Sequence, residues 1–318
     1  MDRRAFLVAL TPLVAGCFGG QPNQPTATAT STETDTPEPT ATATATPEPT
    51  ATATPEPTAS PEAAQHIDAA QDRFTEAVYV YTGGVSGDLL SVTAETETFQ
   101  ARDVLLRLDR VQQSIHAAEA AATTDAQRAT VASLNTMQSF LTHATDAQSW
   151  LIDGHTALTE TYTHLDEREL DDAEDSVERV ETAVDEVSAP TTTLEEELDP
   201  ASADATEVIS ANEYERKVGQ LRAETDIMSD LGDAATDIHD GISMISEARD
   251  QIDEGRDDAA ADTADQAYEL LTDVEDRLDE WLSDLDADAD AFEDVGDDFL
   301  DLASSRAAIA ENIYDRYS

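Results

Sequence analysis

His155 has the best spacing for chemistry among the histidines of this sequence. It falls on the apolar seam that passes through Leu134 and Leu141, and Gln148 lies on the same seam. Polar groups inside proteins are bound by hydrogen bonds, so we expect a buried pair of His155 and Gln148. With carboxylates such as Glu160, His155 would instead form a metal or proton site, which needs at least two more ligands from other helices.

Three aspartates near the C-terminus have the spacing of calcium ligands. Asp286, Asp288 and Asp290 stand at positions one, three and five of a calcium loop. Ala291 occupies the position where the sharp turn needs glycine, and Asp297 occupies the position of the bidentate glutamate. A solvated acidic turn is therefore favoured, and these residues and His155 remain weak metal candidates.

Patterns typical of catalysis are incomplete. The segment GGVSG at 83–87 resembles a nucleophile elbow, but the final glycine of that motif is missing and no strand pattern precedes it. We expect a turn that ends a helix there. No HExxH pattern and no pair of nucleophile and base is found in the sequence. The sequence therefore predicts no catalytic residue, no cofactor and no enzyme.

Cys17 is the only cysteine, so it has no partner for a disulfide and belongs to no cysteine cluster that could bind metal. Arg3 and Arg4 precede a short apolar run that ends at Ala15 and Gly16. This run is too short to span a bilayer as a helix and is typical of a signal peptide. We predict that residues 1–16 form this signal.

Two short motifs resemble those of exported lipoproteins. RRAFL at 3–7 resembles the twin-arginine export signal, and LVAGC at 13–17 resembles a lipobox. The resemblance implies export through Arg3 and Arg4, with Cys17 as a lipid-bearing first mature residue on the extracytoplasmic face of the cell membrane. Asp2 stands where Ser or Thr often precedes the arginine pair. The resemblance implies nothing about the fold.

Residues 17–62 form a predicted stalk after the lipidated cysteine. The unit Thr-Pro-Glu-Pro-Thr-Ala begins at positions 36, 46 and 54. Because proline fixes φ and lacks an N–H donor, this tract is expected to be disordered and extended. At roughly 3.1 Å per residue it would reach on the order of 140 Å. The composition suits an O-glycosylated spacer or a bare linker equally well.

The rest of the chain has the pattern of long helices. Only Pro190 and Pro200 interrupt it, so we predict bundle parts at 63–189 and 201–318 joined by a linker at 190–200. Apolar residues recur with a period near 3.5, which indicates helices packed along their lengths. The predicted fold is an all-α, elongated antiparallel bundle of coiled-coil-like hairpins. The clearest seams are Val104, Leu108, Val111, Ile115 and Ala118, and Leu170, Ala173, Val177, Val180, Val184 and Val187.

Residues 153–187 align weakly with residues 240–274 at a constant offset of 87. The alignment pairs Gly154 with Gly241 and Val187 with Val274. Two explanations stay open: a duplicated helical hairpin, or the shared composition of acidic, alanine-rich helices.

The charge is extreme, with 70 acidic against 17 basic residues, a formal net charge of −53 and one lysine, Lys217. Such a chain repels itself unless salt screens it, and the Debye length is about 3 Å at 1 M salt. The composition resembles that of proteins from extreme halophiles, and with the lipobox it resembles a haloarchaeal surface lipoprotein. Nucleic acid is excluded as a partner because phosphate binding needs basic patches.

Together these features predict a lipid-anchored cell-surface protein with a non-catalytic helical module for binding or structure in the envelope. Its partners would be membrane lipid, through Cys17, and an envelope protein or polymer. The alternative is an envelope capture protein for a metal or small solute. Polar side chains that converge on a cavity inside the bundle would favour capture, whereas continuous apolar seams would favour the binding module.

Overall fold

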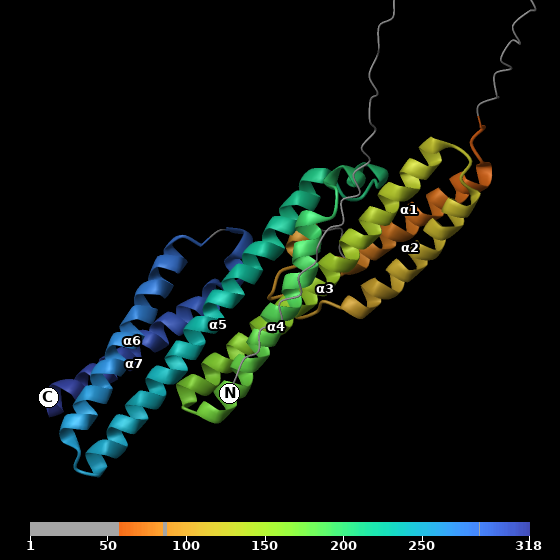
Figure 1. Cartoon of the computed structure of the whole chain (residues 1–318). Helices are drawn as coiled ribbons and strands as arrows, with labels where there is room; N and C mark the ends of the chain where they lie inside the picture. Colours follow the sequence, from red (N-terminus) through yellow and green to blue (C-terminus); the bar gives the residue numbers. More distant parts are fainter. Residues whose placement is uncertain (1–56, 85–87, 286) are drawn as a thin grey trace, which may run out of the picture. The chain divides into compact units, whose positions relative to one another are not determined.

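The computed structural model describes residues 57–84, 88–285 and 287–318. Within these residues the protein is all-α and contains no strand, which confirms the predicted fold class (Figure 1). Cys17, Arg3, Arg4 and most of the expected stalk lie outside the described residues. Pro55–Ser318 forms one compact unit.

Seven α-helices and three short 3-10 helices make up the described chain. The two longest, α3 and α5, have 43 residues each and are therefore about 65 Å long at 1.5 Å per residue. In chain order the elements are α1 (Pro61–Tyr81), η1 (Leu89–Ser91), α2 (Ala101–Ala121), α3 (Asp125–Glu167), α4 (Leu170–Glu196), η2 (Pro200–Ala205), α5 (Ala211–Asp253), α6 (Asp257–Ser283), η3 (Ala287–Phe292) and α7 (Glu293–Tyr317).

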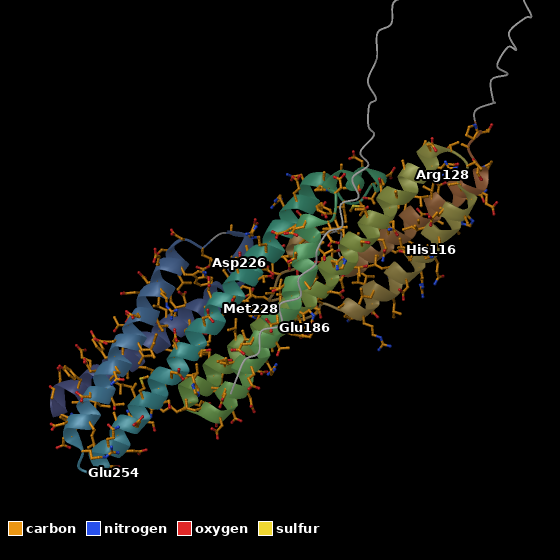
Figure 2. All side chains as sticks on the ribbon, viewed as in Figure 1. His116, Arg128, Glu186, Asp226, Met228 and Glu254 are labelled. Carbon is orange, nitrogen blue, oxygen red and sulfur yellow. The ribbon has the colours of Figure 1, made fainter. Side chains whose placement is uncertain are left out.

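Neighbouring helices pack through the predicted apolar seams. Helix α2 packs on α1, α4 on α3, and α6 on both α5 and α7. Val104, Leu108 and Val111 of α2 are buried, as are Val180 and Val187 of α4. Side chains that end in oxygen project outward from all the helices (Figure 2). The core is therefore apolar along the seams and the acidic groups lie mainly at the surface.

The predicted linker at 190–200 is wrong for residues 190–196, because α4 continues through Pro190 to Glu196. Thr191 and Leu194 are buried on the same face as Val187, so the seam continues past the proline. Proline removes one helical hydrogen bond, to the carbonyl of Glu186. Glu186 is exposed (Figure 2), and water can bind this carbonyl there. The burial of Thr191 and Leu194 thus outweighs the hydrogen bond that is lost at Pro190.

The structure supports the duplicated hairpin. Helices α3 and α5 have 43 residues each and α4 and α6 have 27 each. The six-residue helices η2 and η3 begin at residues 200 and 287, which keeps the offset found in the sequence. The paired glycines also share a role. A Cβ at Gly154 would collide with Met228, and one at Gly241 would lie 2.7 Å from the Leu271 side chain.

The turns of the two hairpins have the same backbone geometry. Arg168 and Gly255 occupy equivalent positions, and both have left-handed φ values, 65° and 72°. After each turn an N–H donates back to the last helical turn, from Glu169 to the His164 carbonyl and from Arg256 to the Gln251 carbonyl, both at 2.8 Å. This is the Schellman end of a helix. Composition alone does not produce matching hydrogen bonds, so duplication is the better explanation.

Substitution of Arg168 by glycine is expected to raise the free energy of unfolding by about 0.5–1 kcal/mol, because the left-handed conformation strains a side chain with a Cβ. Arg168 is exposed. Burial lowers the pKa of Arg306, and the like charge of Arg168 lowers it further, so the substitution also removes this repulsion. Urea denaturation at constant salt measures the effect. The matched control, Gly255→Ala, should lower the free energy of unfolding by about 1 kcal/mol, because it places a Cβ in the same left-handed conformation. If both substitutions changed the free energy of unfolding in the same direction, strain at the left-handed position would not be the cause.

Candidate functional site

The largest polar cluster in the core surrounds Lys217 of α5. This residue is the only lysine of the chain and its side chain is completely buried. Its Nζ donates to the Val92 carbonyl at 2.6 Å, to Gln148 Oε1 at 2.7 Å and to Gln220 Oε1 at 3.0 Å. An ammonium group has three protons. All three are used by acceptors inside the protein.

The same face of α5 binds the backbone of the segment between α1 and α2. Glu213 Oε1 accepts from the Leu89 N–H at 3.2 Å, and Gln220 Nε2 donates to the Leu90 carbonyl at 3.3 Å. The backbone of Ala94 in this segment lies close enough to Glu224 to lower its pKa, against the larger effect of burial, which raises it.

Residues 88–100, which we call the connecting segment, contain no α-helix and bury Leu89, Val92 and Ala94. Buried backbone groups outside regular structure need partners. Positions 213, 217, 220 and 224 recur every three or four residues, so they share one face of the helix. This polar face of α5 supplies the partners that a neighbouring strand or helix would otherwise supply.

Burial also shifts the acidity of the cluster. It lowers the pKa of Lys217 and raises the pKa of Glu224, while the opposite charges of the two groups counteract both shifts. Glu224 accepts from Gln220 Nε2 at 3.1 Å. Burial raises the pKa of Tyr81 well above its usual value, and Glu224 raises it further. The Tyr81 ring centroid lies 5.7 Å from Lys217 Nζ.

This geometry favours a structural role for Lys217. A nucleophilic lysine needs a neutral amine with a free lone pair next to a reactant. Lys217 donates to three acceptors and is enclosed by α3, α5 and the connecting segment. The apolar seams of the sequence do not predict this cluster. Two signals could have revealed it: the presence of a single lysine, and polar residues at helical spacing from 213 to 224 within an apolar seam.

His155 does not form the expected pair with Gln148, so that prediction is wrong. Gln148 Oε1 binds Lys217 instead. The two residues are seven positions apart, which is about two helical turns. The His155 ring meets Phe292 edge-on, with 5.3 Å between ring centroids.

His155 is half-buried in an open groove of about 480 Å³ that Glu95, Glu97 and Glu160 also line. Burial lowers the pKa of His155, and Glu95 and a hydrogen bond to the Ala291 backbone oppose this shift. Glu160 pairs with Arg179. The groove could admit a cation, but its ligand atoms do not converge.

The other weak metal candidates are not brought together either. Asp288 and Asp290 lie in η3, which leads directly into α7, and Asp286 is outside the described residues. Among the described residues, one group has ligand atoms within 4.8 Å of one another, namely His164, Glu169 and Asp172 at the exposed α3–α4 turn. His164 Nδ1 lies 3.0 Å from Glu169 Oε2, so this group is already paired internally.

The turn predicted at 83–87 is confirmed for its first two residues. Gly83 and Gly84 follow the end of α1 and have left-handed φ values of 74° and 77°. Residues 85–87, with the serine of the motif, lie outside the described residues.

Comparison with known proteins finds no relative. No protein-family model matches the chain, and neither the curated proteins nor the solved structures that were compared give a match. Among the described residues, no helix has the length and apolar character needed to cross a membrane. The interpretation of function therefore depends on the chain's own chemistry.

Proposed function

We propose that the protein is a membrane-anchored cell-surface lipoprotein whose helical module binds or organises another envelope component without catalysis. One observation carries the proposal: the buried polar groups around Lys217 bind the chain's own backbone in the connecting segment. Apolar seams fill most of the remaining core. This arrangement supports a rigid module that presents its outer faces, in preference to one that encloses a ligand.

The anchor is proposed from the sequence. Cys17 is the last residue of the lipobox-like segment LVAGC, and the chain has no other thiol with which it could react. Acyl chains contribute about 0.8 kcal/mol per buried CH₂, so two chains hold a protein at a membrane durably. The proline-rich tract between Cys17 and α1 then sets how far the module reaches from the membrane.

Substitution of Cys17 by serine should abolish lipid attachment, because serine cannot form the thioether. The variant should be shed into the medium, or be retained with its signal uncleaved. Mass spectrometry of the mature N-terminus and fractionation of membranes measure both outcomes, and Thr11→Ser serves as a control within the same signal. A wild-type mature chain that starts elsewhere or lacks lipid would disprove the anchor.

The binding function is tested by recovery of partners from envelope extract in high salt. The native full-length protein should retain a specific envelope component, and that binding should depend on salt because the faces of the module are acidic. Turnover of small substrates is not expected. If no partner is retained and a deletion strain grows normally, the binding role is wrong and a passive structural role is left.

The groove beside His155 supports a second candidate, capture of a metal or small solute. The ring nitrogens of His155 and the carboxylates of Glu95 and Glu97 are suitable cation ligands. Saturable, stoichiometric binding that raises the melting temperature of wild type, and that is lost in His155→Ala, would move the protein into this class.

A further inference from the structure

A second groove, between α5 and α6, combines an apolar floor with an acidic rim. Its volume is about 300 Å³. Leu231 and Ala234 of α5 and Leu278 of α6 form the floor and are buried, and Trp281 is half-buried at its end. We call it the Trp281 groove.

The indole ring is held in place from behind. A Cβ at Gly296 of α7 would lie only 2.5 Å from Cζ3 of Trp281, so the glycine allows the ring to pack directly on the α7 backbone. A ring fixed in this way presents a preformed surface to the groove. Little side-chain entropy would then be lost when a ligand packs on it.

The rim carries Asp230, Asp233 and Glu280, which form no ion pair with any of the described residues. Partial burial raises the pKa of Asp230, and the neighbouring charges of Asp233 and Asp226 raise it further, against the opposing effect of Arg277. Negative charge is therefore concentrated on this side of the groove.

The only basic residue of the groove is already paired. Arg277 forms an ion pair with Asp237 of α5. The one lysine of the chain, Lys217, is in the core, so no lysine side chain neutralises the rim. Among the described residues no basic side chain other than Arg277 lines the groove, so the acidic rim is suited to a cation supplied by a partner.

The duplicated hairpin shows that this chemistry is not required by the fold. At an offset of 87, His143, Thr193 and Leu194 of the first hairpin correspond to Asp230, Glu280 and Trp281 of the second. Asp230, Glu280 and Trp281 therefore have no counterpart of the same kind in the first hairpin. A feature of the shared architecture would appear in both.

We propose that the Trp281 groove binds an arginine side chain of a partner polypeptide. The aliphatic stem would pack on Leu231 and Leu278, the guanidinium would lie on the Trp281 ring, and Asp230 and Glu280 would accept its hydrogen bonds. Arginine fits better than lysine because its planar, weakly hydrated cation stacks on an indole and binds two carboxylates at once. This inference rests on the proposed function, since it names the contact through which the module binds.

The test uses the full-length chain with Trp150→Phe, which leaves Trp281 as the only tryptophan. The probes are the peptide acetyl-Leu-Arg-Leu-amide and its citrulline analogue, which keeps the shape but lacks the charge. Tryptophan fluorescence in molar salt should report saturable binding of the arginine peptide and about tenfold weaker binding of the citrulline peptide. Equal responses to both peptides would overturn the proposal.

Variants test where the peptide binds. Asp230→Asn with Glu280→Gln should weaken arginine binding about tenfold. The matched control, Asp262→Asn with Glu269→Gln, removes the same charge from exposed positions of α6 outside the groove and should change it less than about twofold. Equal losses in both double variants would mean that net charge, and not the groove, attracts the peptide.

The outcome separates this inference from the proposed function. If the groove variant loses the peptide but retains the envelope partner, the groove is not the partner contact, and the proposed function stands without it. If wild type binds the peptide in the groove but retains no envelope partner, the groove stands and the proposed function fails.

Discussion

Replacement of Lys217 by methionine is expected to lower the free energy of unfolding by about 3–5 kcal/mol, because it leaves three buried acceptors without their donor and removes the positive charge nearest to Glu224. Methionine has similar length but no donor. The Val92 carbonyl and the amide oxygens of Gln148 and Gln220 would lose their hydrogen bonds. The buried carboxylate of Glu224 would lose its counter-charge. Urea denaturation in molar salt, followed by circular dichroism, measures the change.

Two further variants identify the cause of the stability loss in Lys217→Met. Glu224→Gln added to Lys217→Met should recover part of the loss, because the amide removes the uncompensated charge. Arg216→Met is the matched control, because Arg216 precedes Lys217 on α5, is exposed and forms no ion pair with another described residue. Its effect should stay within about 0.5 kcal/mol. A loss in Lys217→Met no larger than in this control would show that the cluster contributes nothing to stability.

Transfer from molar salt to low salt is expected to abolish cooperative folding. The formal net charge is −53, and most ion pairs of the described residues involve exposed side chains, such as Arg128 with Asp125 and Arg256 with Glu254. The Debye length grows from about 3 Å at 1 M salt to about 30 Å at 0.01 M, so that repulsion then acts between neighbouring helices. Thermal melts by circular dichroism over a salt series measure the loss.

Screening should not depend on the chemical identity of the salt. NaCl and KCl at equal ionic strength should give similar melting temperatures, and small amounts of calcium should not replace them. If calcium did replace them, the chain would hold specific cation sites. A melting temperature independent of salt would show that the packed apolar seams outweigh the repulsion between acidic side chains even when salt does not screen it.

The helices were predictable from the sequence because their seams repeat in a regular way. Val104, Val111 and Val180 are buried where the period places them. Pro190 was misjudged because local cost was weighed without the packing of Val187 and Leu194 on either side. The site was harder to predict. The partners of Lys217 lie on α3 and in the connecting segment, and no periodic pattern relates Val92 to position 217.

The Trp281 groove was not predicted for a related reason. Its lining comes from two helices whose relative register only packing decides, so Asp230 and Trp281 meet without any signal in the spacing of either helix. The offset of 87 residues did identify the hairpins. The offset alone did not indicate that the second hairpin carries a groove with Asp230 and Trp281 that the first hairpin lacks.

The hydrogen bond from Lys217 to Val92 joins residues 125 positions apart. Most other packing in this chain joins helices that follow one another, and such contacts form quickly. The connecting segment therefore gains its partners only after α5 has been placed. Ordering of the 88–100 segment is expected to be a late event in folding, and a chain that ends before α5 would keep this segment open to proteases. Among the described residues, this segment and not the helices on either side of it would thus be the last to become protected.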